Sequence, residues 1–491
     1  MKSKRSHAAK KQPGGLKPRH SGAASAPPKS GPDAGPSLPP RLGPAAPVQI
    51  EKPVYGGDFL ARIEGKAAFV PLVLPREQAR VRIVEEKRSY VAAEAEQIVS
   101  AAPERAAPPC PHFGACGGCQ YQHAIYPAQL RFKLAILRET LERGGGRAPQ
   151  QIEVLAAEPW AYRNRIRLGF DRDGNPGYRG RRSHAVVPIE ECPIAAPVLV
   201  KTALAAAGAF RGLDAAARPA ELSLFCDAAA EWAIAGVFTV GAARQPLAKL
   251  CAALLEHIPA LRGVELVELS REGLPRKHAQ YGAGSLSYRA AGFDYRVDHG
   301  AFFQVNRFLV DPLVERVTAR RSGSLAWDLF AGVGLFARKL AASFRQVIAV
   351  ESSPGATAAL AHNLRGTAAA PVAAATLDFL RKRRRGERPD FVLVDPPRTG
   401  LGAETTALLA AVAAPRITYV SCDPATLARD LRNLTGAGYA IESLTLVDLF
   451  PQTFHLETVV DLKLPLAHSN AAPAPPAHRA SETPNSGRRT P

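Results

Sequence analysis

The sequence predicts an α/β protein in three parts: an N-terminal β-barrel, a central α+β domain and a C-terminal Rossmann-like domain. In the C-terminal third, a strand at 325–330 runs into Gly332-x-Gly334, and an Ala/Leu-rich helix follows. The next strand ends in Glu351, 17 residues after Gly334. Glycines at such a turn let a cofactor approach the backbone, and an acid after the second strand can accept hydrogen bonds from ribose hydroxyls. This arrangement predicts a site for a nucleoside-bearing cofactor.

The N-terminal barrel is expected over 48–105. Apolar and polar residues alternate there, as in 79–84, and glycine and proline interrupt the short strands. This pattern is typical of a small β-barrel. Arg80 and Arg82 would point outward, which fits either a solvated face or an oligonucleotide-binding barrel.

The length of 491 residues favours about three domains, and the formal net charge is +19. Such an excess of positive charge favours association with a polyanion such as RNA. No run approaches the roughly 18 apolar residues of a membrane-spanning helix, and the basic N-terminus lacks an apolar signal segment. We therefore expect a cytoplasmic protein with no membrane contact, and no feature implies a protein partner. The polar, proline-rich tails at 1–47 and 466–491 are expected to be disordered.

The central part, 106–300, begins with a cysteine motif. Cys110, Cys116 and Cys119 lie in one short stretch, and Cys192 is the natural fourth ligand. In a chain without an export signal, this spacing favours a metal site over disulfides. Four thiolates fit a structural zinc ion or an iron–sulfur cluster, and the donor chemistry alone leans toward zinc.

Two stretches of the central part, 160–167 and 178–184, interleave aromatic and basic residues. Guanidinium groups can hold phosphates while aromatic rings stack on unpaired bases, so both stretches fit an RNA interface. An exposed strand face has a similar composition, and both interpretations stay open.

Two further strands of the Rossmann-like domain end in polar residues, one in Asp395 and the next in Cys422. Ligands of open α/β sheets gather at the carboxyl ends of the strands. We therefore expect Gly332, Glu351, Asp395 and Cys422 to face one crevice.

Cys422 is a candidate nucleophile, because Asp423-Pro424 marks the start of a helix directly after it. The positive end of the helix dipole would favour the thiolate that a nucleophile needs. The alternative is a buried structural cysteine, since free cysteines are often buried. Glu457 has apolar neighbours that would raise its pKa, although a lone acid is more often a surface residue.

Six motifs are found together between 48 and 464. They are the cysteine set, Phe303-Gln304-Val305-Asn306, Asp328-Leu329-Phe330-Ala331-Gly332-Val333-Gly334, Asp395-Pro396-Pro397-Arg398-Thr399-Gly400, Ser421-Cys422-Asp423-Pro424 and Phe450-Pro451-Gln452-Thr453-Phe454-His455-Leu456-Glu457. In this combination the chain resembles the S-adenosylmethionine-dependent RNA uracil-5-methyltransferases. The resemblance is closest to the iron–sulfur branch that methylates large-subunit ribosomal RNA.

The resemblance implies the nature of each part. The barrel would be a TRAM domain, an RNA-binding OB-like module, and 301–465 would be the methyltransferase domain. The four cysteines would hold a 4Fe-4S cluster in place of zinc. The S-adenosylmethionine site would comprise Gln304, Phe330, Leu335, Glu351, Asp378 and Asp395.

The resemblance also implies the reaction. Uracil C5 is a poor nucleophile, so the thiolate of Cys422 would first add to C6 and activate C5 for methylation. Glu457 would then remove the C5 proton. The implied substrate is 23S ribosomal RNA. The alternatives are a tRNA uracil-5-methyltransferase and a catalytically silent RNA-binding assembly factor.

Overall fold

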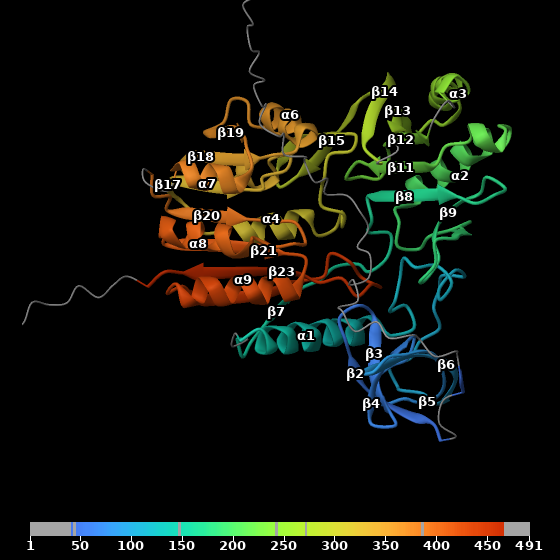
Figure 1. Ribbon diagram of the computed structural model, residues 1–491. Coiled ribbons are helices and arrows are strands. Elements are labelled where there is room, and N and C mark those ends of the chain that lie inside the picture. The colour runs from blue at the N-terminus through green and yellow to red at the C-terminus, as the bar shows by residue number, and fades with distance from the viewer. Residues whose placement is uncertain are drawn as a thin grey trace, which may run out of the picture.

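The computed structural model describes residues 41–42, 46–145, 149–240, 244–270, 273–383 and 387–465. Almost all of the two predicted tails lies outside these residues. In the described part of the chain, no helix is long and apolar enough to cross a membrane. The strands form three sheets and one separate hairpin (Figure 1).

The N-terminal sheet closes into the predicted barrel. Its strands are β1 (Arg41–Leu42), β2 (Val48–Pro53), β3 (Asp58–Ile63), β4 (Lys66–Pro71), β5 (Gln78–Glu86) and β6 (Tyr90–Ser100). The order is β1-β5-β2-β3-β4-β6, and a further pairing of β5 with β6 closes the ring. Ala79, Val81 and Ile83 point into the core, whereas Arg82 points outward and forms an ion pair with Glu94. The alternating pattern of β5 therefore has the predicted orientation.

The central sheet has helices on one face. In order, it runs β10 (Val186–Pro188), β9 (Pro176–Arg179), β8 (Arg165–Phe170), β11 (Glu221–Cys226), β12 (Ala233–Val240), β13 (Leu261–Leu269) and β14 (Pro275–Gly282). The helices α2 (Pro197–Arg211) and α3 (Arg244–His257) pack on it and share its core. A short 3-10 helix, η1 (Ala215–Ala217), precedes β11.

The C-terminal sheet is the doubly wound sheet that the sequence predicts. Its strands are β17 (Gly323–Leu329), β18 (Phe344–Glu351), β19 (Ala369–Ala373), β20 (Phe391–Val394), β21 (Arg416–Ser421), β22 (Ala440–Val447) and β23 (Glu457–Lys463). The helices are α4 (Val310–Thr318), α5 (Leu335–Leu340), α6 (Pro354–Asn363), α7 (Thr376–Arg383), α8 (Gly402–Val412) and α9 (Pro424–Gly436). The first three share the core on one face and the last three the core on the other. All four residues of β20 are buried, as expected for a central parallel strand.

Three segments from 106–300 pack with the C-terminal domain rather than with the central sheet. The helix α1 (Tyr126–Arg143) packs on α9 and also touches the barrel strand β2 (Figure 1). The strand β7 (Glu153–Leu155) pairs in parallel with β22. The hairpin of β15 (Ser285–Ala290) and β16 (Phe293–Asp298) shares the core of α4, α5 and α6. Periodicity shows that these elements have an apolar face, but not which partner covers that face.

Candidate active site

The carboxyl ends of β17, β18, β20 and β21 meet at one edge of the sheet, because these strands pair in parallel with neighbours in register. Glu351 ends β18, and its Oε2 accepts a hydrogen bond from Gly332 N at 2.9 Å. Asp395 follows β20, and its N–H donates to Leu329 O at 3.3 Å. Cys422 follows β21. The structure thus brings Gly332, Glu351, Asp395 and Cys422 together as predicted.

The turn after β17 has the conformation of a close-approach loop. Phe330, Gly332 and Gly334 have φ values of 69°, 56° and 90°. A positive φ is strained for phenylalanine, and such strain is typical of functional sites. Leu335 begins α5, is buried, and accepts a hydrogen bond from Tyr295 Oη at its carbonyl oxygen (3.0 Å). The hydroxyl of Tyr295, in the hairpin of β15 and β16, therefore fixes the backbone at the end of this turn.

Gln304 lies beside Asp395, the residue that follows β20. Its side-chain Nε2 lies 3.4 Å from Asp395 Oδ2, and only 6% of the residue is exposed. The carbonyl of Gln304 accepts a hydrogen bond from Nδ2 of Asn164, which is fully buried (2.8 Å). Asn164 lies in a stretch that the sequence suggested for RNA contact, yet it supports Gln304. Sequence reasoning missed this role because the two residues are 140 positions apart.

Asp378 is the most exposed member of the predicted cofactor set. It lies in the first turn of α7, just after β19, and 60% of its side chain is exposed. Its Oδ1 lies 3.4 Å from Arg381 Nη1. The other five predicted contacts are buried or half-buried.

Cys422 and Glu457 are brought together by an antiparallel ladder. The strands β21 and β23 pair so that Ser421 lies opposite Thr458. Because the pairing is antiparallel, Cys422, which follows Ser421, lies beside Glu457, which precedes Thr458. Glu457 is only 5% exposed. The predicted nucleophile and the predicted base thus share one end of the sheet.

The expectation of a lowered Cys422 pKa is wrong. Burial, followed by the charges of Glu457 and Asp395, raises the pKa of this thiol to about 12. The helix α9 does begin beside it, but the carboxylate of Asp423 takes the first amides and accepts from Ala425 N (3.1 Å) and Thr426 N (2.9 Å). The helix terminus is satisfied by its own cap, so it offers the thiolate little stabilisation.

The site contains several buried carboxyl groups. Burial and the charge of Asp395 raise the pKa of Glu457 well above its usual range. Burial also raises the pKa of Asp395 to about 7. Asp328 is fully buried at the end of β17, and burial together with the charges of Asp395 and Glu351 raises its pKa to about 8. Carboxyl groups poised near neutral pH suit proton transfer.

His455 is held as a neutral ring. Burial and the charge of Arg398 lower its pKa to about 3. Arg398 Nη2 lies 3.3 Å from His455 Nδ1. Arginine can only donate, so Nδ1 accepts and the ring carries its proton on Nε2. This pair joins the Asp395 motif to the Glu457 motif.

The N-terminal barrel also reaches the site, which sequence reasoning missed. Tyr55, in the loop after β2, lies with its hydroxyl 3.3 Å from Asp423 Oδ2. Its ring packs edge-on against Phe454, with centroids 5.5 Å apart. A barrel residue therefore contacts the cap of α9 and the loop before Glu457.

The four predicted cysteine ligands lie close enough to affect one another's ionisation. Burial raises the pKa of Cys119 to about 12, and the charges of Cys192 and Cys116 add to the rise. Burial also raises the pKa of Cys110, with a contribution from Cys192. Among the described residues, no three His, Cys, Asp or Glu side chains form a group that could hold a metal ion. The half-buried Arg163 acts on Cys119 and Cys192, and its Nε has no hydrogen-bond partner among the described residues.

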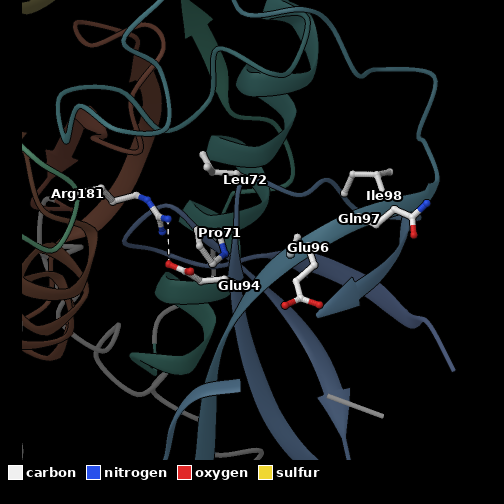
Figure 2. A pocket seen from close by; sticks show the side chains of 8 residues that line it. Pro71, Leu72, Glu94, Glu96, Gln97, Ile98 and Arg181 are labelled. Atoms are coloured by element: carbon white, nitrogen blue, oxygen red, sulfur yellow. Dashed lines mark hydrogen bonds and ion pairs between the residues drawn. The ribbon is translucent and has the colours of Figure 1, made fainter. Parts of the chain in front are cut away.

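Two arginines of the stretch 178–184 bind the barrel. Arg181 Nη2 lies 3.1 Å from Glu94 Oε1, and Arg182 Nη2 lies 2.9 Å from Asp58 Oδ2. Figure 2 shows the Arg181–Glu94 pair at the rim of a small pocket, which contains none of the candidate site residues. These two guanidinium groups join two domains rather than standing free for phosphates.

Comparisons with known proteins agree with this site. The family model for tRNA (uracil-5-)-methyltransferase matches residues 387–464. A 23S rRNA (uracil(1939)-C(5))-methyltransferase RlmD from Chromohalobacter salexigens is 34% identical over 84% of this chain and 88% of its own. The corresponding protein from Klebsiella pneumoniae (strain MGH 78578) is 32% identical over 82% and 92%. Among solved structures, the Pyrococcus abyssi tRNA (uracil-54, C5)-methyltransferase in complex with S-adenosyl-L-homocysteine has a TM-score of 0.67. It is 24% identical, covers 84% of this chain and 99% of its own, and supports the fold.

Proposed function

The chain belongs to the RNA uracil-5-methyltransferase family, and we propose that it forms 5-methyluridine in 23S ribosomal RNA in the cytoplasm. The observation that carries the proposal is the position of Cys422 beside Glu457 at the carboxyl edge of the sheet. A nucleophile and a buried carboxyl group are the two protein groups that uracil C5 methylation requires.

The residues at this edge fit S-adenosylmethionine. The turn of Phe330, Gly332 and Gly334 has the positive φ values that allow close approach. Glu351 accepts from the amides of Gly332, Ser352 and Ser353, which leaves about one of the four acceptor sites of a carboxylate for a ribose hydroxyl. With Gln304 and Asp395 near the same edge, these residues would hold the donor, and Leu335 would contribute its backbone. When bound, S-adenosylmethionine supplies the methyl group.

Cys422 and Glu457 then carry out different steps of the reaction. The thiolate of Cys422, formed when the thiol loses its proton to solvent, bonds to uracil C6, and the C5=C6 π electrons then form the bond from C5 to the methyl group, whose bond to the donor sulfur breaks. Glu457 accepts the proton that C5 still carries. The C5=C6 double bond reforms and the S–C6 bond breaks, which returns Cys422. Asp378, exposed in the first turn of α7, would contact the donor from the α7 side.

Exposed groups beside the site fit an unstacked RNA base. Phe302 is 62% exposed and lies two residues before Gln304. A free aromatic ring at this position suits base stacking, which every base permits. The barrel, for which we propose a TRAM-type RNA-binding role, places Tyr55 at the same site.

We propose a 4Fe-4S cluster at Cys110, Cys116, Cys119 and Cys192. Four thiolates fit such a cluster as well as a zinc ion, and the resemblance to the iron–sulfur branch of the family favours the cluster. The positive charge of the half-buried Arg163 beside these thiols suits the negative charge of such a cluster. Iron and sulfide in equal amounts in anaerobically purified protein would support it, and stoichiometric zinc would overturn it.

The reaction is tested by trapping. The protein is incubated with labelled S-adenosylmethionine and 23S rRNA fragments that contain 5-fluorouridine, whose C5 fluorine cannot leave as a proton. We expect a covalent, methylated protein–RNA adduct that Cys422→Ala abolishes and Cys251→Ala, in the core of the central domain, retains. An adduct formed on tRNA alone would make the chain a tRNA enzyme. No adduct on either RNA would favour the silent assembly factor.

A further inference from the structure

The loop Phe450–His455, which leads into Glu457, is bound to the loop that contains the cysteines. The carbonyl of Gln452 accepts hydrogen bonds from Gln120 N and Tyr121 N, both at 3.0 Å. Gln120 directly follows Cys119 in the chain. The side chain of Gln120 adds to the link, since its Oε1 accepts from Phe454 N (3.4 Å) while its Nε2 donates to Gly117 O (2.9 Å).

Gln452 is also held by α1. The Nε2 of Gln129 donates to Gln452 Oε1 at 2.8 Å, and Gln129 Oε1 accepts from Gln452 N at 3.0 Å. Both residues are 1% exposed. Gln452 has a φ of 68°, a strained conformation that persists only where surrounding contacts fix it. The paired amides of Gln129 and Gln452 provide such contacts.

The two carbonyls before Gln452 are bound as well. Lys133 Nζ donates to Phe450 O at 2.9 Å, and Tyr162 Oη donates to Pro451 O at 3.0 Å. Three successive carbonyls of the loop thus accept hydrogen bonds from residues between 120 and 162. The loop itself has no helix or strand, so these bonds determine its path.

We propose that Gln120 and Gln129 are positioning residues for Glu457. Through Gln452 they fix the loop whose end starts β23, and so they set the place of the carboxylate that takes the C5 proton. The inference rests on the proposed function and deepens it. A base must lie within hydrogen-bond reach of its proton, and a displacement of about 1 Å can cost about 100-fold in rate.

The test separates two steps of the reaction. Trapping on 5-fluorouridine RNA needs Cys422 and methyl transfer but no proton removal, whereas product release from ordinary uridine RNA needs Glu457. In Gln129→Met, which keeps the chain length and loses both hydrogen bonds to Gln452, we expect trapping within about 2-fold of wild type. Release should fall about 10-fold or more, and the methylated covalent complex should accumulate. Gln49→Met, a glutamine of the barrel, is the matched control and should change neither step.

A readout independent of turnover is hydrogen exchange of the free protein. The amides of 450–456 should exchange faster in Gln129→Met and at wild-type rates in Gln49→Met. Gln120→Ala serves if Gln129→Met does not fold. It removes the side-chain hydrogen bonds to Phe454 N and Gly117 O and keeps the backbone bond to Gln452, and it should likewise slow release while leaving trapping unchanged. Equal losses of trapping and release, or no loss of release, would overturn the positioning role. Failure of the wild-type protein to trap would instead overturn the proposed function.

Discussion

The hydroxyl of Tyr55 lies 3.3 Å from Oδ2 of Asp423, so a residue of the N-terminal barrel contacts the residue next to Cys422. Asp423 caps α9 with the same carboxylate. The position of the nucleophile therefore depends on a domain that is far away in the sequence. An isolated C-terminal domain would lack this contact.

Tyr55→Phe should slow adduct formation on 5-fluorouridine RNA. The substitution keeps the ring against Phe454 and removes the hydrogen bond to Asp423, which is worth about 1 kcal/mol, or about 5-fold in rate if it acts fully on the nucleophile. The matched control is Tyr439→Phe, whose hydroxyl donates to Ala414 O at 2.9 Å in the same domain as the site. Equal trapping rates in the two variants would show that Tyr55 supports folding alone.

The pH dependence of trapping should report the raised pKa of Cys422. With a pKa of about 12, caused by burial and the charges of Glu457 and Asp395, the group is almost entirely thiol at neutral pH. Once Asp395 and Glu457 are ionised, the thiolate fraction rises about 10-fold per pH unit, so above their pKa values the trapping rate should rise about 10-fold per unit toward the pKa of Cys422.

Glu457→Gln tests the cause of that shift. At a pH above the raised pKa of Glu457, where this group is ionised, loss of its charge should lower the pKa of Cys422 and speed trapping, while release of methylated uridine falls about 100-fold or more. Glu442→Gln, an exposed acid of β22 paired with Arg416, is the control and should leave both steps unchanged. Slower trapping in Glu457→Gln would assign Glu457 a role in thiol activation instead.

The edge of the sheet could be predicted from the sequence because it depends on local patterns. An apolar run fixes where a strand ends, and parallel pairing then brings Glu351, Asp395 and Cys422 to one edge. β23 runs antiparallel to β21, so the position of Glu457 can be predicted only if the register between these two strands is known. That register, which places Glu457 beside Cys422, is visible in the structure alone.

The electrostatics could not be predicted in the same way, because they depend on partners that are distant in the sequence. Asp423 marked a helix start, yet its carboxylate occupies the amides that Cys422 was expected to use. Arg181 and Arg182 had the composition of an RNA contact, and each instead pairs with an acid of the barrel. A sequence pattern shows which groups are present but does not show which of them already have partners.

Asp328 should make the protein less stable as pH rises. Its folded pKa of about 8 is above the value of about 3.9 expected when unfolded, so the folded state holds more protons between these values. The sign follows directly: unfolding releases a proton, and the free energy of unfolding falls with pH across this window by up to about 1.4 kcal/mol per unit. Asp328→Asn should flatten this slope in urea unfolding at pH 5 and pH 8. Asp294→Asn, at an exposed site, should keep the wild-type slope.

Lys133 and Asp448 form an ion pair with both side chains fully buried and Nζ 2.6 Å from Oδ1. Burial lowers the pKa of Lys133, and the charge of Asp448 opposes that shift. Removal of one partner leaves a buried charge unpaired, so Lys133→Met should destabilise the protein by about 3–5 kcal/mol in urea unfolding. The double variant Lys133→Met/Asp448→Leu should lose less than the sum of the two single variants, because neither charge is then left alone. Additive losses would show that the pair contributes mainly through its other contacts, Tyr126 Oη on Asp448 and the carbonyl of Phe450 on Lys133.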